Sequence, residues 1–242
     1  PTTAGRIDVS GTGESLLLGA GDGGVDLVPL AEPGRARRLG THDGLCGVAL
    51  SPDGRWAVST SSPGGAVCVW DVARGTLVHR LPHEGEYCGA TFGPDGRWLV
   101  TAVRRDFCFW EVGSWELKAR LVRDPRSLFS LVAFTRDGGL LALAQGRNRI
   151  ELRDAATLRH LATLETSDMA NLTGLSLSPD GTRLAATTDY NVIALWDLRR
   201  LRQELAALGL DWEMPQYPLP GADASPGQPL RVEVLPADKS PR

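Results

Sequence analysis

A four-residue turn recurs along the chain at a nearly constant spacing and constrains the fold more than any other feature. Its clearest copy is Ser51-Pro52-Asp53-Gly54. Proline presets φ, aspartate bonds nearby backbone groups and glycine supplies a positive φ, so this order of residues is typical of a tight turn. Related turns begin at Gly93, Thr135 and Ser178, with a weaker copy at Ser10. The spacing of about 42 residues indicates a repeat architecture.

Each repeat contains four short apolar runs separated by turns. In the second repeat these runs are Leu45–Leu50, Trp56–Thr60, Ala66–Trp70 and Thr76–Leu81. Short runs rich in Val, Leu and aromatic residues between turns predict four antiparallel strands. The first three runs are apolar on both faces, and the fourth alternates apolar and polar residues, which predicts an outermost, half-exposed strand. The sequence therefore predicts an all-β fold.

Five such units and a different C-terminal segment divide the chain. We expect the units at about residues 5–39, 45–81, 87–121, 128–164 and 172–198, the last with three strands. Leucines at helical spacing then predict an amphipathic helix over 199–212. The Pro-rich residues 213–229 are typical of a linker, 230–235 alternate like a strand, and 236–242 are expected to be a disordered tail.

Two further marks recur with the same period. The third strands end in Trp70-Asp71, Trp110-Glu111, Arg153-Asp154 and Trp196-Asp197. A histidine precedes the first strand of two units, at His42 and His83. Neither mark is informative alone, but their agreement with the turn period is specific.

These marks together resemble WD40 repeats over about residues 5–198. The resemblance implies a β-propeller, in which each unit forms one four-stranded blade around a central axis. It also implies structural roles for the aromatic and acidic residues that end the third strand, and for a histidine bonded to the strand framework. In this chain the matching residues are His42, His83, Trp70, Asp71, Trp110, Glu111, Asp154, Trp196 and Asp197. The fourth unit lacks the Trp and the His and the first lacks the Trp-Asp pair, so we expect apolar packing to hold those two blades.

The number of blades is small for this family, which most often closes its ring with seven. We expect either further blades before Pro1 or a partner that completes the ring, and a closed five-bladed ring is the second choice. The helix, linker and strand also resemble the segments found after WD40 arrays in large bacterial multidomain proteins, some of which carry serine/threonine protein kinase domains. The segment 230–235 could then supply the missing outer strand of the fifth blade or belong to a following domain.

The sequence offers little for catalysis. It contains no nucleophile elbow, phosphate-binding loop, dinucleotide fingerprint or kinase signature. Its four histidines do not pair with another His or Cys at ligand spacing, so we expect no metal and no cofactor. The acidic residues fall in turns, mostly one per repeat, and do not suggest a converging acid–base pair.

Composition narrows the partners and the compartment. A net charge of −3 does not favour nucleic acid or an anionic membrane, and no apolar run approaches the ~20 residues of a spanning helix. The cysteines form two pairs at repeat spacing, Cys46 with Cys88 and Cys68 with Cys108, which predicts buried, reduced thiols. Without a secretory leader at the start, these features predict a cytoplasmic protein.

One charge pattern suggests a binding surface. In a propeller, the loops between the second and third strands and those between blades open on one face, which we call the rim. Six arginines fall in such loops of the third and fourth units: Arg104, Arg105, Arg123, Arg126, Arg147 and Arg149. The corresponding loops elsewhere carry acidic residues: Asp22, Asp43, Glu84, Glu86, Glu165, Asp168 and Asp189. Since arginine binds carboxylates and phosphates in bidentate fashion, the basic sector predicts an acidic or phosphorylated peptide partner, against the alternative of a solvated rim.

We therefore predict a non-catalytic scaffold for protein–protein interaction. One alternative is a regulatory or sensory module of a larger bacterial protein such as a serine/threonine kinase. Another is a propeller enzyme, hydrolase-like, with a site at the axis. The residues near the axial ends of the first strands, which include Asp8, Gly47, Gly89 and Gly174, offer little for that chemistry.

Overall fold

A computed structural model describes residues 6–62, 66–82, 89–102, 105–124, 131–166, 170–215 and 217. The chain divides into two units, residues 1–212 and residues 213–242. The sheets and the helix belong to the first unit. The predicted linker, the strand at 230–235 and the tail lie outside the described residues, except for residues 213–215 and 217.

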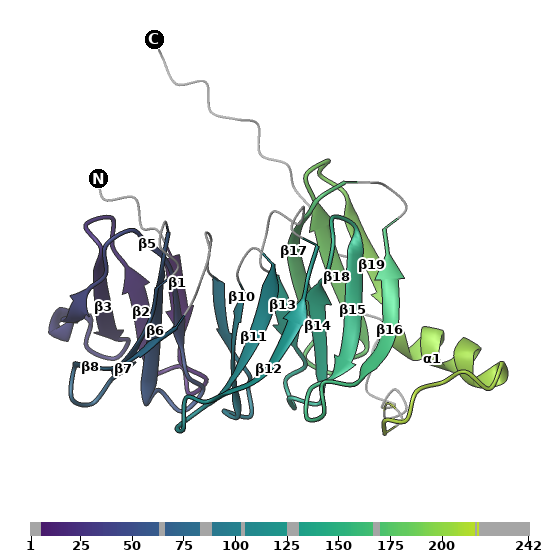
Figure 1. Ribbon diagram of the computed structural model, residues 1–242, viewed down its shortest axis with the longest axis horizontal. Coiled ribbons are helices and arrows are strands. Elements are labelled where there is room, and N and C mark those ends of the chain that lie inside the picture. The colour runs from purple at the N-terminus through teal and green to yellow at the C-terminus, as the bar shows by residue number, and fades with distance from the viewer. Residues whose placement is uncertain are drawn as a thin grey trace, which may run out of the picture. The chain divides into compact units, whose positions relative to one another are not determined.

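The described residues form five antiparallel sheets, each built from strands that follow one another in sequence (Figure 1). The first contains β1 (Arg6–Val9), β2 (Ser15–Gly19), β3 (Gly24–Pro29) and β4 (Arg37–Thr41), with a 3₁₀ turn at Pro33–Arg35. The second contains β5 (Leu45–Leu50), β6 (Trp56–Ser61), β7 (Val67–Asp71) and β8 (Thr76–Leu81). The third contains β9 (Gly89–Phe92), β10 (Trp98–Ala102), β11 (Asp106–Glu111) and β12 (Leu117–Val122). The fourth contains β13 (Val132–Phe134), β14 (Leu140–Ala144), β15 (Arg149–Asp154) and β16 (His160–Glu165), and the fifth contains β17 (Leu172–Leu177), β18 (Arg183–Thr188) and β19 (Ile193–Asp197). The predicted all-β fold, with a helix α1 (Leu198–Ala207) after the last strand, is confirmed.

The recurring turn joins the first and second strands of every sheet, and one backbone hydrogen bond, from the glycine N–H to the carbonyl three residues earlier, is common to all five turns. In the fifth sheet the Ser178 hydroxyl donates to Asp180 Oδ1 at 2.6 Å, and the same Asp180 oxygen accepts the Thr182 backbone N–H at 3.1 Å. The Gly181 N–H donates to the Ser178 carbonyl at 2.8 Å. Gly181 has a φ of 70°, a conformation that costs glycine little and other residues more. The turn is thus held by hydrogen bonds among its own residues.

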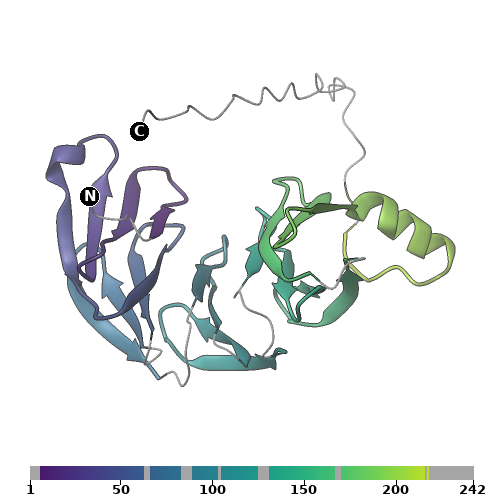
Figure 2. The same ribbon diagram turned by 90° about the horizontal axis from the view of Figure 1, so that it is seen from above.

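Neighbouring sheets pack face to face, and their first strands lie next to one another. β1 contacts β5, β5 contacts β9 and β13 contacts β17 (Figure 2). Between the second and third sheets, for example, Val69, Leu99 and Trp110 belong to one buried apolar cluster. β7 is buried along its whole length, whereas the outermost strand β8 is mostly exposed, as its alternation predicts. A sheet that buries apolar residues on both faces depends on a neighbour on each side.

A buried polar chain holds the end of the second sheet's third strand. The indole N–H of Trp70 donates to Ser59 Oγ at 2.9 Å, and Ser59 Oγ lies 2.9 Å from His42 Nδ1. All three residues are at most 6% exposed. Burial lowers the pKa of His42, so its ring is neutral at neutral pH. The structural role implied for Trp70 and His42 is thus visible as geometry.

The corresponding hydrogen bonds are incomplete or replaced in the third, fourth and fifth sheets. In the third, Trp110 donates to the hydroxyl of Thr101 at 2.9 Å, and His83 lies outside the described residues. In the fifth, Ala186 occupies the position that Ser59 has in the second sheet, and it supplies no hydroxyl acceptor for Trp196. In the fourth, Arg153 replaces the tryptophan and pairs with Glu151 at 2.8 Å.

The third strands of the second to fifth sheets end in an acidic residue, which accepts hydrogen bonds from the segment that follows. Asp71 Oδ1 accepts the Arg74 N–H at 2.8 Å, and Asp154 Oδ1 accepts the Thr157 N–H at 2.7 Å. Glu111 accepts the Ser114 hydroxyl at 2.9 Å. In the fifth sheet, Asp197 accepts the Arg200 N–H at 2.9 Å and is the N-cap of α1. The same bond from a backbone N–H to an aspartate therefore begins a turn in the second and fourth sheets and a helix in the fifth.

The helix is shorter than predicted and packs differently. It ends at Ala207, before the predicted limit of 212, because Gly209 adopts a φ of 70° and the Leu210 N–H returns to the Leu205 carbonyl at 2.9 Å. An amphipathic helix is expected to bury its apolar stripe, but Leu208, at the end of that stripe, is 72% exposed. The second buried residue of α1 besides Leu198 is Arg202, which pairs with Asp211 at 2.9 Å. Figure 2 shows α1 projecting away from the fifth sheet.

The described cysteines behave as small apolar residues. Cys68 and Cys108 are free thiols, 2% and 1% exposed. Burial raises the pKa of both thiols, which keeps them protonated and unreactive. The side chain of Cys46 and all of Cys88 lie outside the described residues.

The turn carboxylates make stability dependent on acid pH. Hydrogen bonds from Ser178 and Thr182 hold the pKa of Asp180 below its usual 3.8, and the Thr135 side chain and Gly139 N–H do the same for Asp137. A lowered folded-state pKa adds stability above the unfolded pKa and loses it as the pH falls through the folded pKa. We expect the free energy of unfolding, measured with urea, to fall between about pH 5 and pH 2. Asp180→Asn should reduce this slope, and an unchanged slope would contradict the role of the turn.

Removing the buried hydroxyl should destabilise the second sheet. Ser59→Ala leaves the Trp70 indole N–H and the His42 ring without their shared partner, which we expect to cost about 2–4 kcal/mol of unfolding free energy. Ser62→Ala, at a half-buried residue just beyond the same strand, is the matched control and should change stability by less than about 0.5 kcal/mol. Urea unfolding of both variants at neutral pH measures the difference in unfolding free energy. Equal effects would show that the hydrogen bonds of Ser59 with Trp70 and His42 add no stability beyond that of an ordinary serine.

Candidate binding surfaces

The rim carries a cavity of about 340 Å³ above the fourth sheet, built around two arginines. Arg147 and Arg149 are exposed and lie at the turn from β14 into β15. The strands bring this turn beside the connection from the third sheet, because the Asp124 N–H donates to the Gln145 carbonyl at 2.9 Å. The cavity is lined by Asp124, Gln145, Gly146, Arg147, Asn148, Arg149 and Glu165.

Hydrogen bonds between side chains orient Arg147 and link the rim loops of the fourth and fifth sheets. Arg147 Nε donates to Asn171 Oδ1 at 2.9 Å, and Asn171 Nδ2 donates to Asp189 Oδ2 at 2.6 Å. Backbone bonds support the same contact, since the Leu172 N–H donates to the Arg147 carbonyl at 2.8 Å. The guanidinium is therefore held through Nε, and its two outer nitrogens have no partner among the described residues.

Arg149 is held in a similar way. Its Nε donates to Glu165 Oε1 at 3.1 Å, and both side chains are more than half exposed. An exposed ion pair of this kind contributes little to stability. It does fix the direction of the guanidinium, whose outer nitrogens again have no partner in the described part of the chain. Two oriented guanidinium groups thus present free donors at one cavity, which suits bidentate binding of an anion.

The remaining arginines of the predicted basic sector are placed less favourably. Arg105 is exposed on the rim. Arg123 is 2% exposed, and its guanidinium carbon lies 5.2 Å from the centre of the Phe107 ring, so burial takes it out of the exposed surface and lowers its pKa. Arg104 and Arg126 lie outside the described residues.

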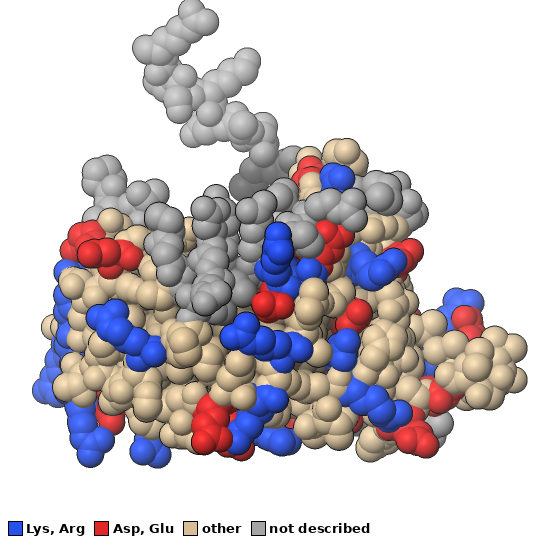
Figure 3. Space-filling model, viewed as in Figure 1, with Lys and Arg blue, Asp and Glu red and all other residues tan. Residues whose placement is uncertain are grey.

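In the described part of the rim, basic and acidic side chains are not separated into two sectors. Glu165 lies in the same cavity as the two arginines, and Asp189 is linked to Arg147 through Asn171. Asp22, expected on the acidic side, pairs with Arg38 at 2.9 Å. Figure 3 accordingly shows positive and negative side chains side by side above β13 to β16. Glu84, Glu86 and Asp168 lie outside the described residues.

Asn171 is the residue that sequence reasoning missed. It sits in the connection between the fourth and fifth sheets, where neither the repeat period nor its residue type marks it. Its role depends on Arg147 and Asp189, which are 24 and 18 residues away in the sequence. In the sequence, Asn171 is marked only as a short amide directly before β17, the first strand of the fifth sheet.

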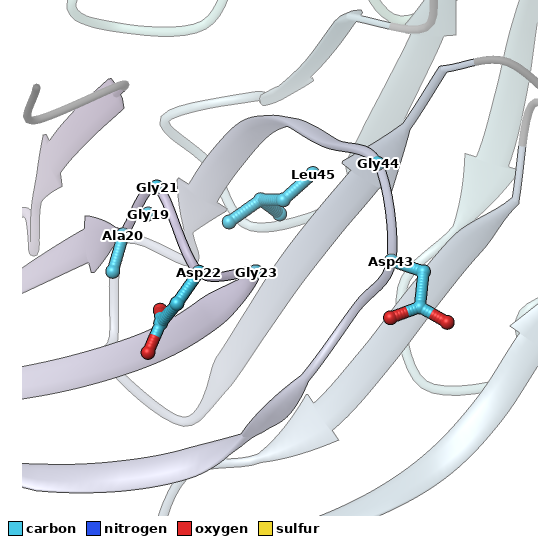
Figure 4. A pocket seen from close by; sticks show the side chains of 8 residues that line it. All are labelled: Gly19, Ala20, Gly21, Asp22, Gly23, Asp43, Gly44 and Leu45. Atoms are coloured by element: carbon cyan, nitrogen blue, oxygen red, sulfur yellow. The ribbon is translucent and has the colours of Figure 1, made fainter.

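A second rim cavity, of about 350 Å³, lies over the first sheet and is lined mainly by glycine. Figure 4 shows that the side chains of Asp22 and Asp43 point away from each other, while Leu45 extends toward the Gly21–Gly23 turn. Asp22 Oδ1 accepts the Gly24 N–H at 2.9 Å, as expected for a turn between strands. The cavity therefore has no converging charges, and we assign it no ligand.

A third cavity, of about 690 Å³, lies along the first strands of the first three sheets, where an axial site would be expected. Its charged residues are Asp8 and Arg136, and the described lining includes no histidine, cysteine or second carboxylate. Asp8 is engaged by the backbone, since its Oδ2 accepts the Leu50 N–H at 2.8 Å, and burial raises its pKa. This geometry does not assemble an acid–base pair.

In the described part of the chain, no three His, Cys, Asp or Glu side chains come together to hold a metal ion. No helix among the described residues is long and apolar enough to cross a membrane.

Comparison with known families matches two segments, residues 35–71 and 158–197, to the family described as WD domain, G-beta repeat. The first segment contains Trp70-Asp71 and the second contains Trp196-Asp197. Together they cover less than half of the chain. A search of curated proteins found no match.

Solved structures with a similar fold include the hydrazine synthase of Kuenenia stuttgartiensis, with a TM-score of 0.63, 20% identity, and coverage of 76% of this chain and 55% of that one. Another is the β-propeller domain of Cps50 (Swd1) from Myceliophteria thermophila, with a TM-score of 0.67, 20% identity, and coverage of 81% of this chain and 67% of that one. The chain thus spans about half the length of the hydrazine synthase chain. At this identity the likeness shows the fold alone. The chain is built of β-propeller blades, and two of its segments match WD repeats.

Proposed function

We propose that this chain is a non-catalytic scaffold for protein–protein interaction, whose rim over the fourth and fifth sheets binds an acidic or phosphorylated segment of a partner. The observation that carries the proposal is the pair of exposed guanidinium groups of Arg147 and Arg149, each held through Nε beside one cavity. WD repeats and a β-propeller fold agree with a scaffold, because rigid sheets present their loops as a binding surface.

The geometry favours an anionic group over an apolar one. The cavity is lined mostly by polar residues, and both arginines direct free donors outward. Their neighbours Asp124 and Glu165 lower the net charge of the cavity, which favours a ligand placed against the guanidinium groups over one bound by a diffuse positive field. The same surface would serve whether the partner is a separate protein or a domain of a larger bacterial protein such as a kinase.

Charge reversal at the two arginines tests this function. The probe is a fluorescein-labelled peptide with a central run of phosphoserines, compared with the same peptide carrying aspartates or serines. Each charge-assisted bond contributes about 1.5–3 kcal/mol, so Arg147→Glu with Arg149→Glu should weaken binding of the phosphorylated peptide at least about tenfold. Fluorescence anisotropy at two salt concentrations measures this loss and its electrostatic origin.

The matched control is Arg35→Glu with Arg200→Glu. Both arginines are 77% exposed, lie away from the rim cavity and pair with Glu32 and Glu204. This variant makes the same change in net charge and should bind the peptide as the unaltered protein does. If neither anionic peptide binds the unaltered protein, or if both double variants lose binding equally, the rim site is refuted.

A further inference from the structure

An exposed tyrosine lies at the tip of the turn that joins β18 to β19, at the end of the fifth sheet opposite α1 (Figure 1). The Thr188 N–H donates to the Val192 carbonyl at 3.0 Å and the Asn191 N–H donates to the Thr188 carbonyl at 3.2 Å, which closes the turn around Tyr190. The Tyr190 side chain is 69% exposed and, among the described residues, makes no hydrogen bond or ring contact. The ring is therefore available to a partner.

Hydrogen bonds through Asn171 fasten this turn to the rim site of Arg147. The Asp189 N–H donates to the Asn171 carbonyl and the Asn171 N–H donates to Asp189 Oδ1, both at 3.0 Å. Asn171 Nδ2 donates to Asp189 Oδ2 at 2.6 Å, and Asn171 Oδ1 accepts Arg147 Nε at 2.9 Å. Because Tyr190 directly follows Asp189, these bonds fix the backbone from which its side chain extends, relative to the Arg147 guanidinium.

The spacing between the tyrosine turn and Arg147 follows from the backbone contacts. The Leu172 N–H donates to the Arg147 carbonyl at 2.8 Å, and the Asp189 N–H donates to the Asn171 carbonyl. Segments joined by backbone hydrogen bonds lie about 4.8 Å apart, so two such steps separate the Arg147 loop from Asp189 by about 10 Å. An extended peptide advances about 3.3 Å per residue and covers this distance in about three residues.

Tyr190 is the aromatic exception among the rim turns that the structure describes in full. The turn from β2 to β3 comprises residues 20–23 and that from β14 to β15 comprises residues 145–148, and neither contains an aromatic residue. Tyrosine is enriched among interface residues that carry much of the binding energy, because its ring buries a large apolar area and immobilises few rotatable bonds. The rim next to the anion site therefore carries an apolar anchor as well as charged donors.

We propose that Tyr190 determines which anionic partners bind the rim, by packing against an apolar side chain about three residues from the phosphorylated or acidic residue held by Arg147. The inference rests on the proposed function and narrows its partner class to segments that combine one anionic and one apolar residue at this spacing. Arg147 supplies the charged contact, and the Tyr190 ring removes an apolar side chain from water. Anionic segments without such an apolar residue bind through the two arginines alone, and more weakly.

Two peptides that differ only in their apolar residues test the role of Tyr190. The first is fluorescein-labelled and carries a single phosphoserine with a leucine three residues away on each side, which covers either chain direction. In the second, both leucines are alanines. The unaltered protein should bind the leucine peptide about fivefold more tightly in fluorescence anisotropy, because part of one leucine side chain is buried. Added salt should weaken both peptides and leave their ratio unchanged, since an apolar contact is not screened.

Two substitutions at Tyr190 separate its ring from the rest of the site. Tyr190→Ala should weaken the leucine peptide about fivefold and leave the alanine peptide unchanged, whereas Tyr190→Phe keeps the ring and should bind both as before. The bonds that orient Arg147 come from Asn171 and Asp189 and are kept in both variants. The matched control is Leu210→Ala, which removes a 66% exposed apolar side chain beyond α1 and should change neither affinity.

The possible results separate this inference from the proposed function. If both peptides bind the unaltered protein equally, or if Tyr190→Ala weakens them equally, the specificity role of Tyr190 is overturned and the anion site at Arg147 and Arg149 stands. Equal losses in Tyr190→Phe and Tyr190→Ala would also overturn it, because the hydroxyl and not the ring would then be the contact. If neither peptide binds, the proposed function fails and the inference falls with it.

Discussion

Face-to-face packing of neighbouring sheets is the interaction on which the rest of the structure depends. The strand β10 is uncharged and buried along its length, and its side chains belong to two apolar clusters. One of these, the cluster around Val69, Leu99 and Trp110, is shared by two sheets. No sheet can bury these residues alone. The buried chain of His42, Ser59 and Trp70 adds direction to this packing, because its donors and acceptors must meet at fixed positions.

This arrangement separates the residues that build the scaffold from those that can bind. The carboxylates of the recurring turns and of the caps, such as those of Asp180 and Asp71, accept hydrogen bonds from neighbouring residues in the sequence. The loops at the other ends of the strands carry fewer such constraints. There the guanidinium groups of Arg147 and Arg149 keep donors free, and the rigid sheets hold the loops that position them.

The fifth sheet differs from the other four, because three strands and a following helix take the place of four strands among the described residues. Its third strand β19 has no outer neighbour among the described residues, and Asp197, at the position where Asp71 caps a turn, is the N-cap of α1 instead. The same bond from a backbone N–H to an aspartate thus precedes a turn after β7 and a helix after β19. The difference lies in the next residues of the chain, since Leu198–Ala207 propagate a helix whereas the residues after Asp71 return as β8.

The sequence by itself determined the repeat, the turns, the strand order and the position of the helix, because these depend on residues close together in the chain. It also identified Trp70 and His42 as structural and Arg147 and Arg149 as rim residues. Only the tertiary structure decided that Arg123 is buried against Phe107, that Asn171 links Arg147 to Asp189, and that basic and acidic side chains share one cavity. These contacts join residues many positions apart, and their partners are chosen by how sheets pack, which no local pattern encodes.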